Sequence, residues 1–343
     1  MKAMVLNRIV RLSEDPAPLV LEERPKPVPG DREILVKVAA CGVCHTELDE
    51  IEGRTAPPRL PVIPGHQVVG RVDARGPGAS RFPVGARVGI AWIHSSCGAC
   101  KFCRVGLENL CPDFKATGRD ADGGYAEFIK VHEDYATPIP DVLSDESAAP
   151  LLCAGTIGWR SFRLTGLADG ARLGLGGFGA SASLVIAMVR RVQPRTRVYV
   201  FSRKEGERAF ARELGAVWAG DFPEAPPAKL DAIIDTTPVW KPVVQELGHL
   251  DAGGRLVINA IRKQDDDKPE LLKLDYAKHL WMEKETKSVA NVTRKDVAEC
   301  LEIAAGIPLK PEVQVYPLEE ANRALLEIKT GKIRGAKVLR IGS

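Results

Sequence analysis

The sequence carries little net charge and no long apolar run. It has 48 Lys and Arg against 45 Asp and Glu, and the resulting net charge of +3 is too small to indicate a nucleic acid as partner. The apolar run 184–189 is far below membrane-spanning length, and the N-terminal residues lack the apolar core of a signal peptide. Internal repeats and low-complexity tracts are also lacking. We therefore expect a cytoplasmic protein with neither a membrane nor a nucleic-acid partner.

Length and local pattern indicate two domains. A chain of 343 residues exceeds what one hydrophobic core usually serves. Up to about residue 90, short apolar runs alternate with Pro and Gly breaks, as in an all-β domain. After Cys153, apolar strands alternate with helical stretches, which predicts a parallel α/β sheet with strands at 171–175, 197–201, 232–235 and 255–259. A last segment, with helices at 295–305 and 318–330 and strands at 313–316 and 336–341, can return to the first domain. We place the domains at 1–153, 154–291 and 292–343.

Four of the eight cysteines form a cluster. In a cytosolic protein, clustered cysteines are more often metal ligands than disulfides. Spacings of two, two and seven residues let a loop alone wrap one ion, which predicts a closed structural zinc site in a lobe at 95–112. The alternatives are an iron–sulfur cluster or reactive thiols, but the nearest ferredoxin spacing has three residues before its last cysteine, not seven. The four ligands would be Cys97, Cys100, Cys103 and Cys111.

Cys44 and His66 provide a thiolate and an imidazole, the ligand types that Zn²⁺ selects, and each lies near a glycine. Cys153 is the candidate third ligand. Three protein ligands leave a fourth tetrahedral position open, which distinguishes a catalytic zinc from a structural one. Taken alone, such a cysteine can be a small buried apolar residue and such a histidine a satisfied polar one.

A glycine-rich loop lies between a predicted strand and a predicted helix at 180–192. In this setting the loop predicts a dinucleotide site, because its glycines allow a tight turn and the helix N-terminus binds a pyrophosphate. Its residues are Gly174, Gly176, Gly177, Phe178 and Gly179.

The end of the second strand indicates which nicotinamide cofactor binds. An acid is expected there for NAD, but this chain has Ser202, Arg203 and Lys204. A hydroxyl and a guanidinium can bind a 2′-phosphate, which favours NADP over NAD. The alternative is that Arg203 stacks on the adenine or points into solvent while Glu205 reaches the ribose, as an NAD-type acid would.

With these motifs in order, the chain resembles the zinc-dependent medium-chain alcohol dehydrogenases over essentially its whole length, nearest the cinnamyl and aryl alcohol dehydrogenase branch. The resemblance implies a GroES-like β-rich catalytic domain and a Rossmann cofactor domain with a doubly wound parallel sheet. It rests on Gly42-Val-Cys-His-Thr46, Pro64-Gly-His66, the four-cysteine lobe, Leu152-Cys-Ala-Gly155, the glycine loop and Ile333-Arg-Gly-Ala-Lys-Val-Leu339.

The resemblance also implies residue roles. Cys44, His66 and Cys153 match the catalytic zinc ligands and the four lobe cysteines the structural ones, giving two zinc ions per chain. Thr46 matches the hydroxyl that takes the alcohol proton, Glu47 a carboxylate that orients the ligand histidine, and Trp92 a position that lines the substrate pocket, although an aromatic residue filling the core is as good an explanation. The remaining matches are His45 and Arg334, which would contact the cofactor pyrophosphate, and Cys41 and Cys300, which match no ligand.

Two residues depart from the family pattern. Gln67 stands where a glutamate is usual, so the negative charge thought to assist ligand exchange on zinc is missing. Asp49 stands where many members end a proton relay with a histidine. The alternatives are that Asp49 accepts the proton itself or that the relay ends in water, and we expect a solvated surface acid there.

The expected function is hydride transfer between a primary or aryl alcohol or aldehyde and NADP(H) or NAD(H). The resemblance implies a homodimer or homotetramer. Two alternatives stay open, a zinc-free quinone reductase of the same superfamily and a zinc-binding interaction module without catalysis. The latter has a poor electrostatic basis, because only Lys101 and Arg104 lie between the first and last lobe cysteines.

Overall fold

The computed structural model describes residues 1–307, 311–331 and 335–342, and it divides into two compact units. Unit 1 comprises Met1–Cys153 and Val292–Ser343, and unit 2 comprises Ala154–Asn291. None of the helices in these described ranges combines the length and the hydropathy needed to cross a membrane.

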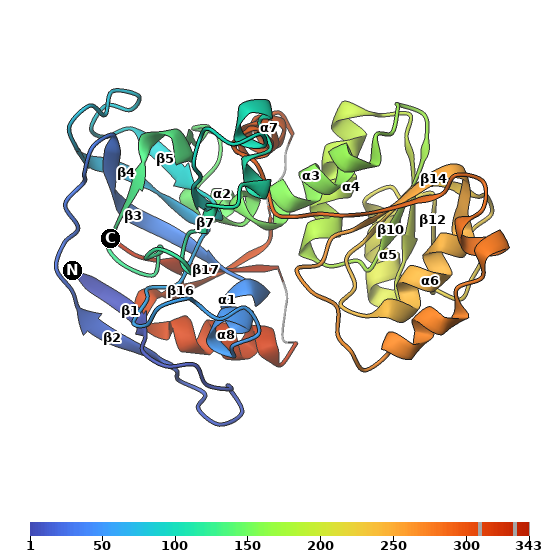
Figure 1. Ribbon diagram of the computed structural model, residues 1–343, viewed down its shortest axis with the longest axis horizontal. Coiled ribbons are helices and arrows are strands. Elements are labelled where there is room, and N and C mark those ends of the chain that lie inside the picture. Colours follow the sequence, from blue (N-terminus) through green and yellow to red (C-terminus); the bar gives the residue numbers. More distant parts are fainter. Residues whose placement is uncertain (308–310, 332–334, 343) are drawn as a thin grey trace. The chain divides into compact units, whose positions relative to one another are not determined.

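A seven-stranded sheet forms the centre of unit 1 (Figure 1). Its order is β16-β17-β3-β4-β5-β9, with β8 also paired to β3. All of these pairs are antiparallel except the parallel pair of β16 and β17. The strands are β3 (Glu33–Val43), β4 (Val68–Arg75), β5 (Arg87–Ile90), β8 (Phe128–His132), β9 (Ala136–Pro138), β16 (Val313–Pro317) and β17 (Ala336–Arg340). Two small sheets complete the unit, β1 (Lys2–Leu6) with β2 (Leu19–Glu23) and β6 (Ile93–Ser95) with β7 (Lys115–Ala116).

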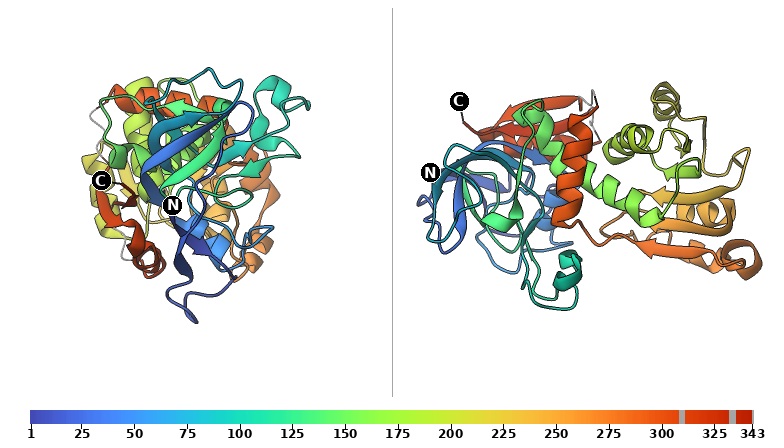
Figure 2. Two further views of the ribbon diagram at one scale, coloured as in Figure 1. Left: turned by 90° about the vertical axis from the view of Figure 1, so that its left-hand side faces the viewer. Right: turned by 90° about the horizontal axis from the view of Figure 1, so that it is seen from above.

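Short helices surround this sheet. α7 begins at a capping box of Thr293 and Asp296 and packs beside η4 (Figure 2). α8 packs against α1. The α-helices are α1 (His45–Ile51), α2 (Asp145–Ala148), α7 (Arg294–Ala305) and α8 (Ala321–Lys329), and the 3₁₀ turns are η1 (Cys103–Val105), η2 (Glu108–Leu110), η3 (Glu133–Tyr135), η4 (Ala149–Leu152) and η7 (Leu318–Glu320).

The C-terminal strand β17 completes the sheet that the first segment of the chain begins. It pairs with the end of β3, placing Leu339 opposite Cys41 and Lys337 opposite Val43. Residues 40–43 of β3 and residues 337–339 of β17 are buried, and β3 has sheet neighbours on both of its edges. The residue that follows β3 is Cys44, so the returning strand supports the chain just before a predicted ligand.

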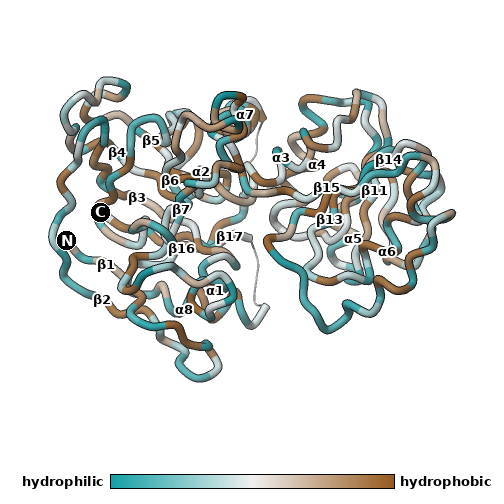
Figure 3. Tube along the Cα trace, viewed as in Figure 1, coloured by the Kyte–Doolittle hydropathy of each residue, from teal (hydrophilic) through white to brown (hydrophobic). Residues whose placement is uncertain are grey.

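Unit 2 contains a six-stranded sheet in the order β12-β11-β10-β13-β14-β15, and every neighbouring pair is parallel. The order reverses between β10 and β13, which confirms the predicted doubly wound sheet. Its apolar residues follow the strands, while polar stretches occupy the connecting loops (Figure 3). The strands are β10 (Arg172–Gly176), β11 (Arg197–Phe201), β12 (Trp218–Gly220), β13 (Leu230–Asp235), β14 (Leu250–Ile258) and β15 (Glu285–Ser288).

The helices of unit 2 connect these strands. α5 packs against β11 and β12, and α6 packs against β13 and β14. A buried cluster including Phe201, Leu230 and Leu256 fills the space around them. The helices are α3 (Ala154–Thr165), α4 (Ala180–Val192), α5 (Glu205–Glu213) and α6 (Trp240–His249), followed by the 3₁₀ turn η5 (Lys268–Lys273) and the π-helical turn η6 (Tyr276–Leu280).

Candidate functional site

Cys44, His66 and Cys153 converge in unit 1 although they are far apart in sequence. Cys44 follows β3, His66 precedes β4 and Cys153 follows η4. The Cys44 Sγ lies 3.7 Å from His66 Nε2 and 4.0 Å from Cys153 Sγ. Ligands around a tetrahedral Zn²⁺ stand about 3.6 Å (S to N) and about 3.8 Å (S to S) apart when the metal bonds have their usual lengths. The two separations from Cys44 are therefore close to those that one zinc ion requires, and all three donor atoms lie within 4.8 Å of one another.

Glu47 fixes the orientation of the His66 ring. Its Oε1 lies 2.7 Å from His66 Nδ1, and its Oε2 accepts a hydrogen bond from the Cys44 N–H at 2.8 Å. Both side chains are buried. A proton on Nδ1, next to this carboxylate, would leave the lone pair of Nε2 for a metal ion. One carboxylate thus positions two of the three ligands, and it also closes a capping box at the start of α1.

Burial and the neighbouring groups shift the pKa values of two residues in this cluster. The contact with Cys153 and burial raise the pKa of Cys44 well above its ordinary value. Burial disfavours a charged imidazole, but Glu47 and Cys44 outweigh it and raise the pKa of His66. A divalent cation among these atoms would replace their protons and stabilise the thiolates. The chemistry of the donor set therefore fits zinc.

The four lobe cysteines form a second cluster whose sulfur atoms lie within 4.8 Å of one another. Cys103 Sγ lies 3.9 Å from Cys97 Sγ and 3.6 Å from Cys100 Sγ. The N–H groups of Ala99 and Cys100 lower the pKa of Cys97 to about 7. Four protein sulfurs complete a tetrahedron without a position for substrate, as in a structural zinc site.

The lobe is attached to the rest of unit 1 through Glu108. This buried carboxylate accepts hydrogen bonds from the backbone N–H of Arg294, at 2.9 Å, and from its guanidinium, at 3.1 Å. Because Arg294 is the first residue of α7, the lobe and the returning C-terminal segment hold each other.

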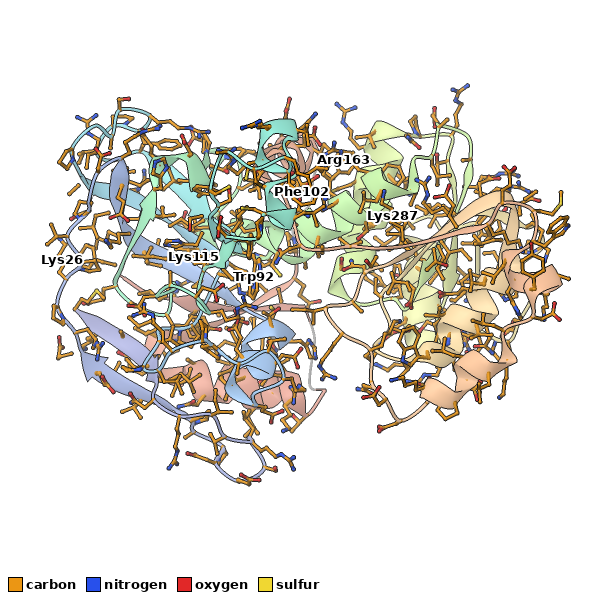
Figure 4. The ribbon with its side chains drawn as sticks, in the orientation of Figure 1. Lys26, Trp92, Phe102, Lys115, Arg163 and Lys287 are labelled. Carbon is orange, nitrogen blue, oxygen red and sulfur yellow. The ribbon has the colours of Figure 1, made fainter. Side chains whose placement is uncertain are left out.

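Thr46 and His45 occupy the first turn of α1, next to Cys44. The Thr46 N–H lies 3.4 Å from Cys44 Sγ, and its half-buried hydroxyl makes no hydrogen bond within the described ranges. The His45 side chain is exposed. Trp92 is buried, and its ring meets the His66 ring edge-on with centroids 4.8 Å apart, so it forms a wall of the ligand cluster (Figure 4).

Asp49 differs from the sequence-based expectation. It is only 6% exposed and accepts a hydrogen bond from Arg54 Nε, so the prediction of a solvated surface acid is wrong. Its helix position turns it inward, and Arg54 neutralises it. Gln67 is also buried, and its Nε2 finds no hydrogen-bond partner among the described residues. Its amide packs against Gly42, where a Cβ would lie 2.3 Å from Gln67 Oε1.

The glycine loop of unit 2 links β10 to α4 as predicted. Gly177 has φ +78°, a conformation that favours glycine, and Gly179 is the N-cap of α4 without a side-chain cap. The first N–H groups of α4 are therefore uncapped by a side chain, as a pyrophosphate site requires. Phe178 is buried against Phe210, with ring centroids 6.0 Å apart. A Cβ on Gly174 would lie 2.8 Å from Ile233, so this glycine permits close strand packing.

A buried polar group lies beneath this loop. Glu246 of α6 is fully buried, and neither of its carboxylate oxygens has a hydrogen-bond partner in the described part of the chain. A Cβ on Gly176 would lie 1.8 Å from Glu246 Oε1, so only glycine fits there. Burial and the nearby Asp235 raise the pKa of Glu246 well above its ordinary value, which keeps the group neutral.

Lys263 ties the loop after β14 to the end of β13. Its buried ammonium donates to Asp235 Oδ2 and to the carbonyl oxygens of Thr237, at 2.7 Å, and Val239, at 3.0 Å. Asp235 is fully buried and also accepts from the N–H and hydroxyl of Thr237. The carboxyl ends of β10 and β13 flank the point where strand order reverses, so this ion pair shapes the region where a dinucleotide binds in such sheets.

The residues expected to select the cofactor lie after β11. Ser202 is 3% exposed and donates to Glu207 Oε2 at 2.6 Å, while Lys204 Nζ lies 3.0 Å from Glu207 Oε1. Arg203 is exposed and makes no ion pair or hydrogen bond within the described ranges. Sequence reasoning missed Glu207, although its spacing of three from Lys204 was a usable signal.

Glu205 does not turn toward the end of β11 in this structure. Its carboxylate is bound by Arg208, at 2.5 Å and 2.8 Å, and by Arg212 at 3.2 Å. This arrangement weakens the alternative in which Glu205 acts as the ribose acid. Arg334, predicted to contact the pyrophosphate, lies outside the described residues.

Comparison with known proteins identifies the family. Residues 30–141 match the Alcohol dehydrogenase GroES-like domain. The chain is 43% identical to the probable alcohol dehydrogenase AdhA of Mycobacterium tuberculosis (strain CDC 1551 / Oshkosh), covering 99% of this chain and 97% of that protein. It is 33% identical to an alcohol dehydrogenase of Geobacillus stearothermophilus, covering 99% of both. The crystal structure of an NAD-dependent alcohol dehydrogenase superposes with a TM-score of 0.86 at 25% identity over 100% of both chains. Full-length similarity at this level, joined to the two-unit fold, shows that the chain belongs to the medium-chain alcohol dehydrogenases.

Proposed function

We propose that the protein is a zinc-dependent alcohol dehydrogenase and aldehyde reductase that uses a nicotinamide cofactor. The observation that carries this proposal is the cluster of Cys44, His66 and Cys153, with sulfur and nitrogen atoms 3.7 Å and 4.0 Å apart around a common centre. When bound, zinc supplies a Lewis acid for the alcohol oxygen and the nicotinamide accepts the hydride. Three ligands leave the fourth position for substrate.

The residues around the cluster have distinct tasks. Glu47 orients His66 so that Nε2 faces the metal position. Trp92 packs against the His66 ring and lines the site. The Thr46 hydroxyl, adjacent to Cys44 and without another partner among the described residues, takes the proton of the alcohol. Asp49 is engaged by Arg54, so we place the end of the proton path at solvent beyond Thr46 and not at this acid.

We assign a structural zinc to the lobe cysteines, which gives two zinc ions per chain. All eight cysteines are free thiols, a state that metal binding requires and that a reducing cytoplasm maintains. Unit 1 would then be the catalytic domain, made from 1–153 with the lobe at 95–112 and from 292–343, and unit 2, residues 154–291, the cofactor domain.

For the cofactor we favour NADP over NAD. Arg203 is an exposed cation at the end of β11 that has no ion-pair partner in the described part of the chain, and its planar fork suits a phosphate. The glycine loop and the uncapped start of α4 would hold the pyrophosphate. His45 and Arg334 are assigned to the same pyrophosphate from the resemblance.

Primary or aryl alcohols are the proposed substrates, and a homodimer or homotetramer is the proposed assembly. Trp92 offers an aromatic wall that suits an apolar substrate. β15 is an exposed edge strand that includes Lys287 (Figure 4), and large apolar residues of the preceding segment are exposed. An open edge beside apolar surface favours pairing between copies. The apolar residues are Leu272, Tyr276, Leu280, Trp281 and Met282.

Metal analysis combined with an activity panel tests the proposal. We expect two zinc ions per chain and oxidation of primary or aryl alcohols with NADP⁺ or NAD⁺. Cys44→Ser should lose one zinc and all turnover while retaining the fold, because the lobe is an independent site. Cys300→Ala is the matched control, since this buried thiol lies outside both clusters and should leave the zinc content unchanged.

The same measurements separate the alternatives. One zinc or none in the wild type, with quinone reduction retained, would identify a zinc-free reductase. Two zinc ions without turnover of any alcohol or aldehyde would favour an interaction module. Turnover retained in zinc-depleted Cys44→Ser would contradict the assignment of the catalytic site.

A further inference from the structure

The carboxylate of Glu207 binds two of the residues that follow β11 and that the sequence predicts to select the cofactor. Its two oxygens engage separate donors, the Ser202 hydroxyl at 2.6 Å and the Lys204 ammonium at 3.0 Å. Ser202 is nearly fully buried, so its hydroxyl has few other partners to choose from. Its oxygen also receives the backbone N–H of Lys204 at 3.3 Å, which fixes the turn after β11.

The neighbouring arginines of α5 already have ion-pair partners. Arg208 binds Glu205 and also donates to the carbonyl of Ser202 at 2.8 Å. Arg212 binds Glu205 and the carbonyl of Ala219. Within the described part of this region, Arg203 is the cation that has no such partner. The start of α5 therefore carries a connected set of ion pairs. Within it, Glu207 binds the Ser202 hydroxyl and the Lys204 ammonium, which lie next to the end of β11.

We infer that Glu207 is a specificity-determining residue that acts against the 2′-phosphate of NADP. This inference rests on the proposed nicotinamide-dependent function. Ser202 and Lys204 are the donor types that bind a phosphate at this edge of a doubly wound sheet, and Glu207 engages both with a negative charge of its own. A bound phosphate has to displace that carboxylate, and it is repelled while the carboxylate stays. The NADP preference that Arg203 and Lys204 favour is thereby reduced, and NAD remains an acceptable cofactor.

Glu207 lies two residues after the start of α5, so its role differs from that of the acid at the end of the second strand in NAD enzymes. That acid accepts hydrogen bonds from the ribose hydroxyls. Glu207 instead satisfies a protein hydroxyl and a protein ammonium, so removing its charge should leave NADH binding nearly unchanged. The inference thus predicts an effect on one cofactor and not on the other, which a general loss of structure cannot produce.

Equilibrium binding of NADPH and NADH to the zinc-loaded enzyme tests the inference. Fluorescence titration would be done on wild type, Glu207→Gln and the control Glu213→Gln, which removes an exposed acid of the same helix that has no ion pair within the described ranges. We expect Glu207→Gln to lower the Kd for NADPH roughly tenfold, or about 1.4 kcal/mol, since that is near the lower end of charged hydrogen-bond energies. The Kd for NADH should change less than about twofold, and Glu213→Gln should match wild type.

A second variant tests whether the Ser202 hydroxyl binds the 2′-phosphate once the Glu207 carboxylate is removed. In the Glu207→Gln background, Ser202→Ala should remove much of the NADPH gain, because the released hydroxyl is one of the phosphate donors. An unchanged NADPH to NADH ratio in Glu207→Gln would overturn the inference while the proposed function stood. A selective loss of NADH affinity would also overturn it and make Glu207 a ribose acceptor. Failure of the wild type to bind either cofactor would instead refute the proposed function itself.

Discussion

The ion pair of Lys263 and Asp235 gives the sharpest test of what holds the proposed cofactor region together. In Lys263→Met the fully buried Asp235 would lose its counter-ion, and the carbonyls of Thr237 and Val239 would lose a donor. Burial already raises the pKa of Asp235, although Lys263 and Thr237 act in the opposite direction. Without the lysine, the carboxyl group should bind a proton in the folded state.

The cost of that proton sets the expected magnitude. An unfolded Asp has a pKa near 3.9, so holding it neutral at pH 7 costs about 4 kcal/mol at about 1.36 kcal/mol per pH unit. This agrees with the loss of about 3–5 kcal/mol expected when one partner of a buried ion pair is removed. The folded variant keeps a proton that the unfolded chain releases, so its stability falls as pH rises. At pH 5 the cost should be only about 1.5 kcal/mol.

Urea unfolding followed by tryptophan fluorescence measures this difference in unit 2. The chain has five tryptophans, and all except Trp92 lie in that unit, so the signal reports mainly on its unfolding. Lys241→Met is the control, because that lysine is exposed on α6. The double variant Lys263→Met with Asp235→Asn should recover most of the loss, since an amide oxygen still accepts from Thr237. A loss below about 1 kcal/mol at pH 7, or one independent of pH, would refute the reasoning.

Three further changes probe other parts of the fold. Gly176→Ala places a Cβ against the Glu246 carboxylate and should lower the free energy of unfolding by about 1–3 kcal/mol, measured by thermal unfolding. Adding Glu246→Ala should restore part of that stability. If it restored none, the contact between these two residues would be contradicted. Cys103→Ser should release one of two zinc ions and lower the melting temperature, by about 2–4 °C for each kcal/mol of stability lost. An unchanged melting temperature would show that the lobe does not stabilise unit 1. Hydrogen bonding from Lys337 lowers the pKa of Glu327 to about 2, so its contribution to stability is complete above pH 4.5 and is lost as pH falls toward 2. Lys337→Met should flatten this dependence, and equal acid unfolding curves for variant and wild type would count against the pair.

The fold and the metal clusters were accessible from sequence because their signals are local. The strand at 197–201 and the helix at 180–192 have the bounds observed for β11 and α4, since each is a continuous apolar pattern ended by polar residues. The four lobe cysteines needed no tertiary reasoning, because short spacings bring their sulfurs together in any compact loop. Cys153 could be named from the residues only as a candidate third ligand, and the resemblance supported it, since nothing near it in sequence shows that it joins Cys44 and His66.

Features decided by tertiary contacts were not accessible. β15, with the sequence Glu-Thr-Lys-Ser, has no apolar pattern; it becomes a strand because β14 offers an edge. Asp49 resembles a surface acid until the position of Arg54 is known. The hold of Glu207 on Ser202 depends on side-chain conformations at a helix start, which a linear pattern does not specify. These are also the features on which proton transfer and cofactor choice depend.

The pairing of β17 with the end of β3 has a consequence for the order of events on the ribosome. Residues 40–43 are translated long before residues 336–340, by roughly 15–60 s at common rates of synthesis. Unit 2 is one continuous segment and can fold during that interval, whereas unit 1 keeps an open β edge next to Cys44 until the last strand emerges. The nascent chain is thus exposed to misassociation through that edge, and the cluster of Cys44, His66 and Cys153 gains this support only once β17 has been synthesised. Truncation before β17 should therefore yield an aggregating polypeptide whose nucleotide-binding half is folded.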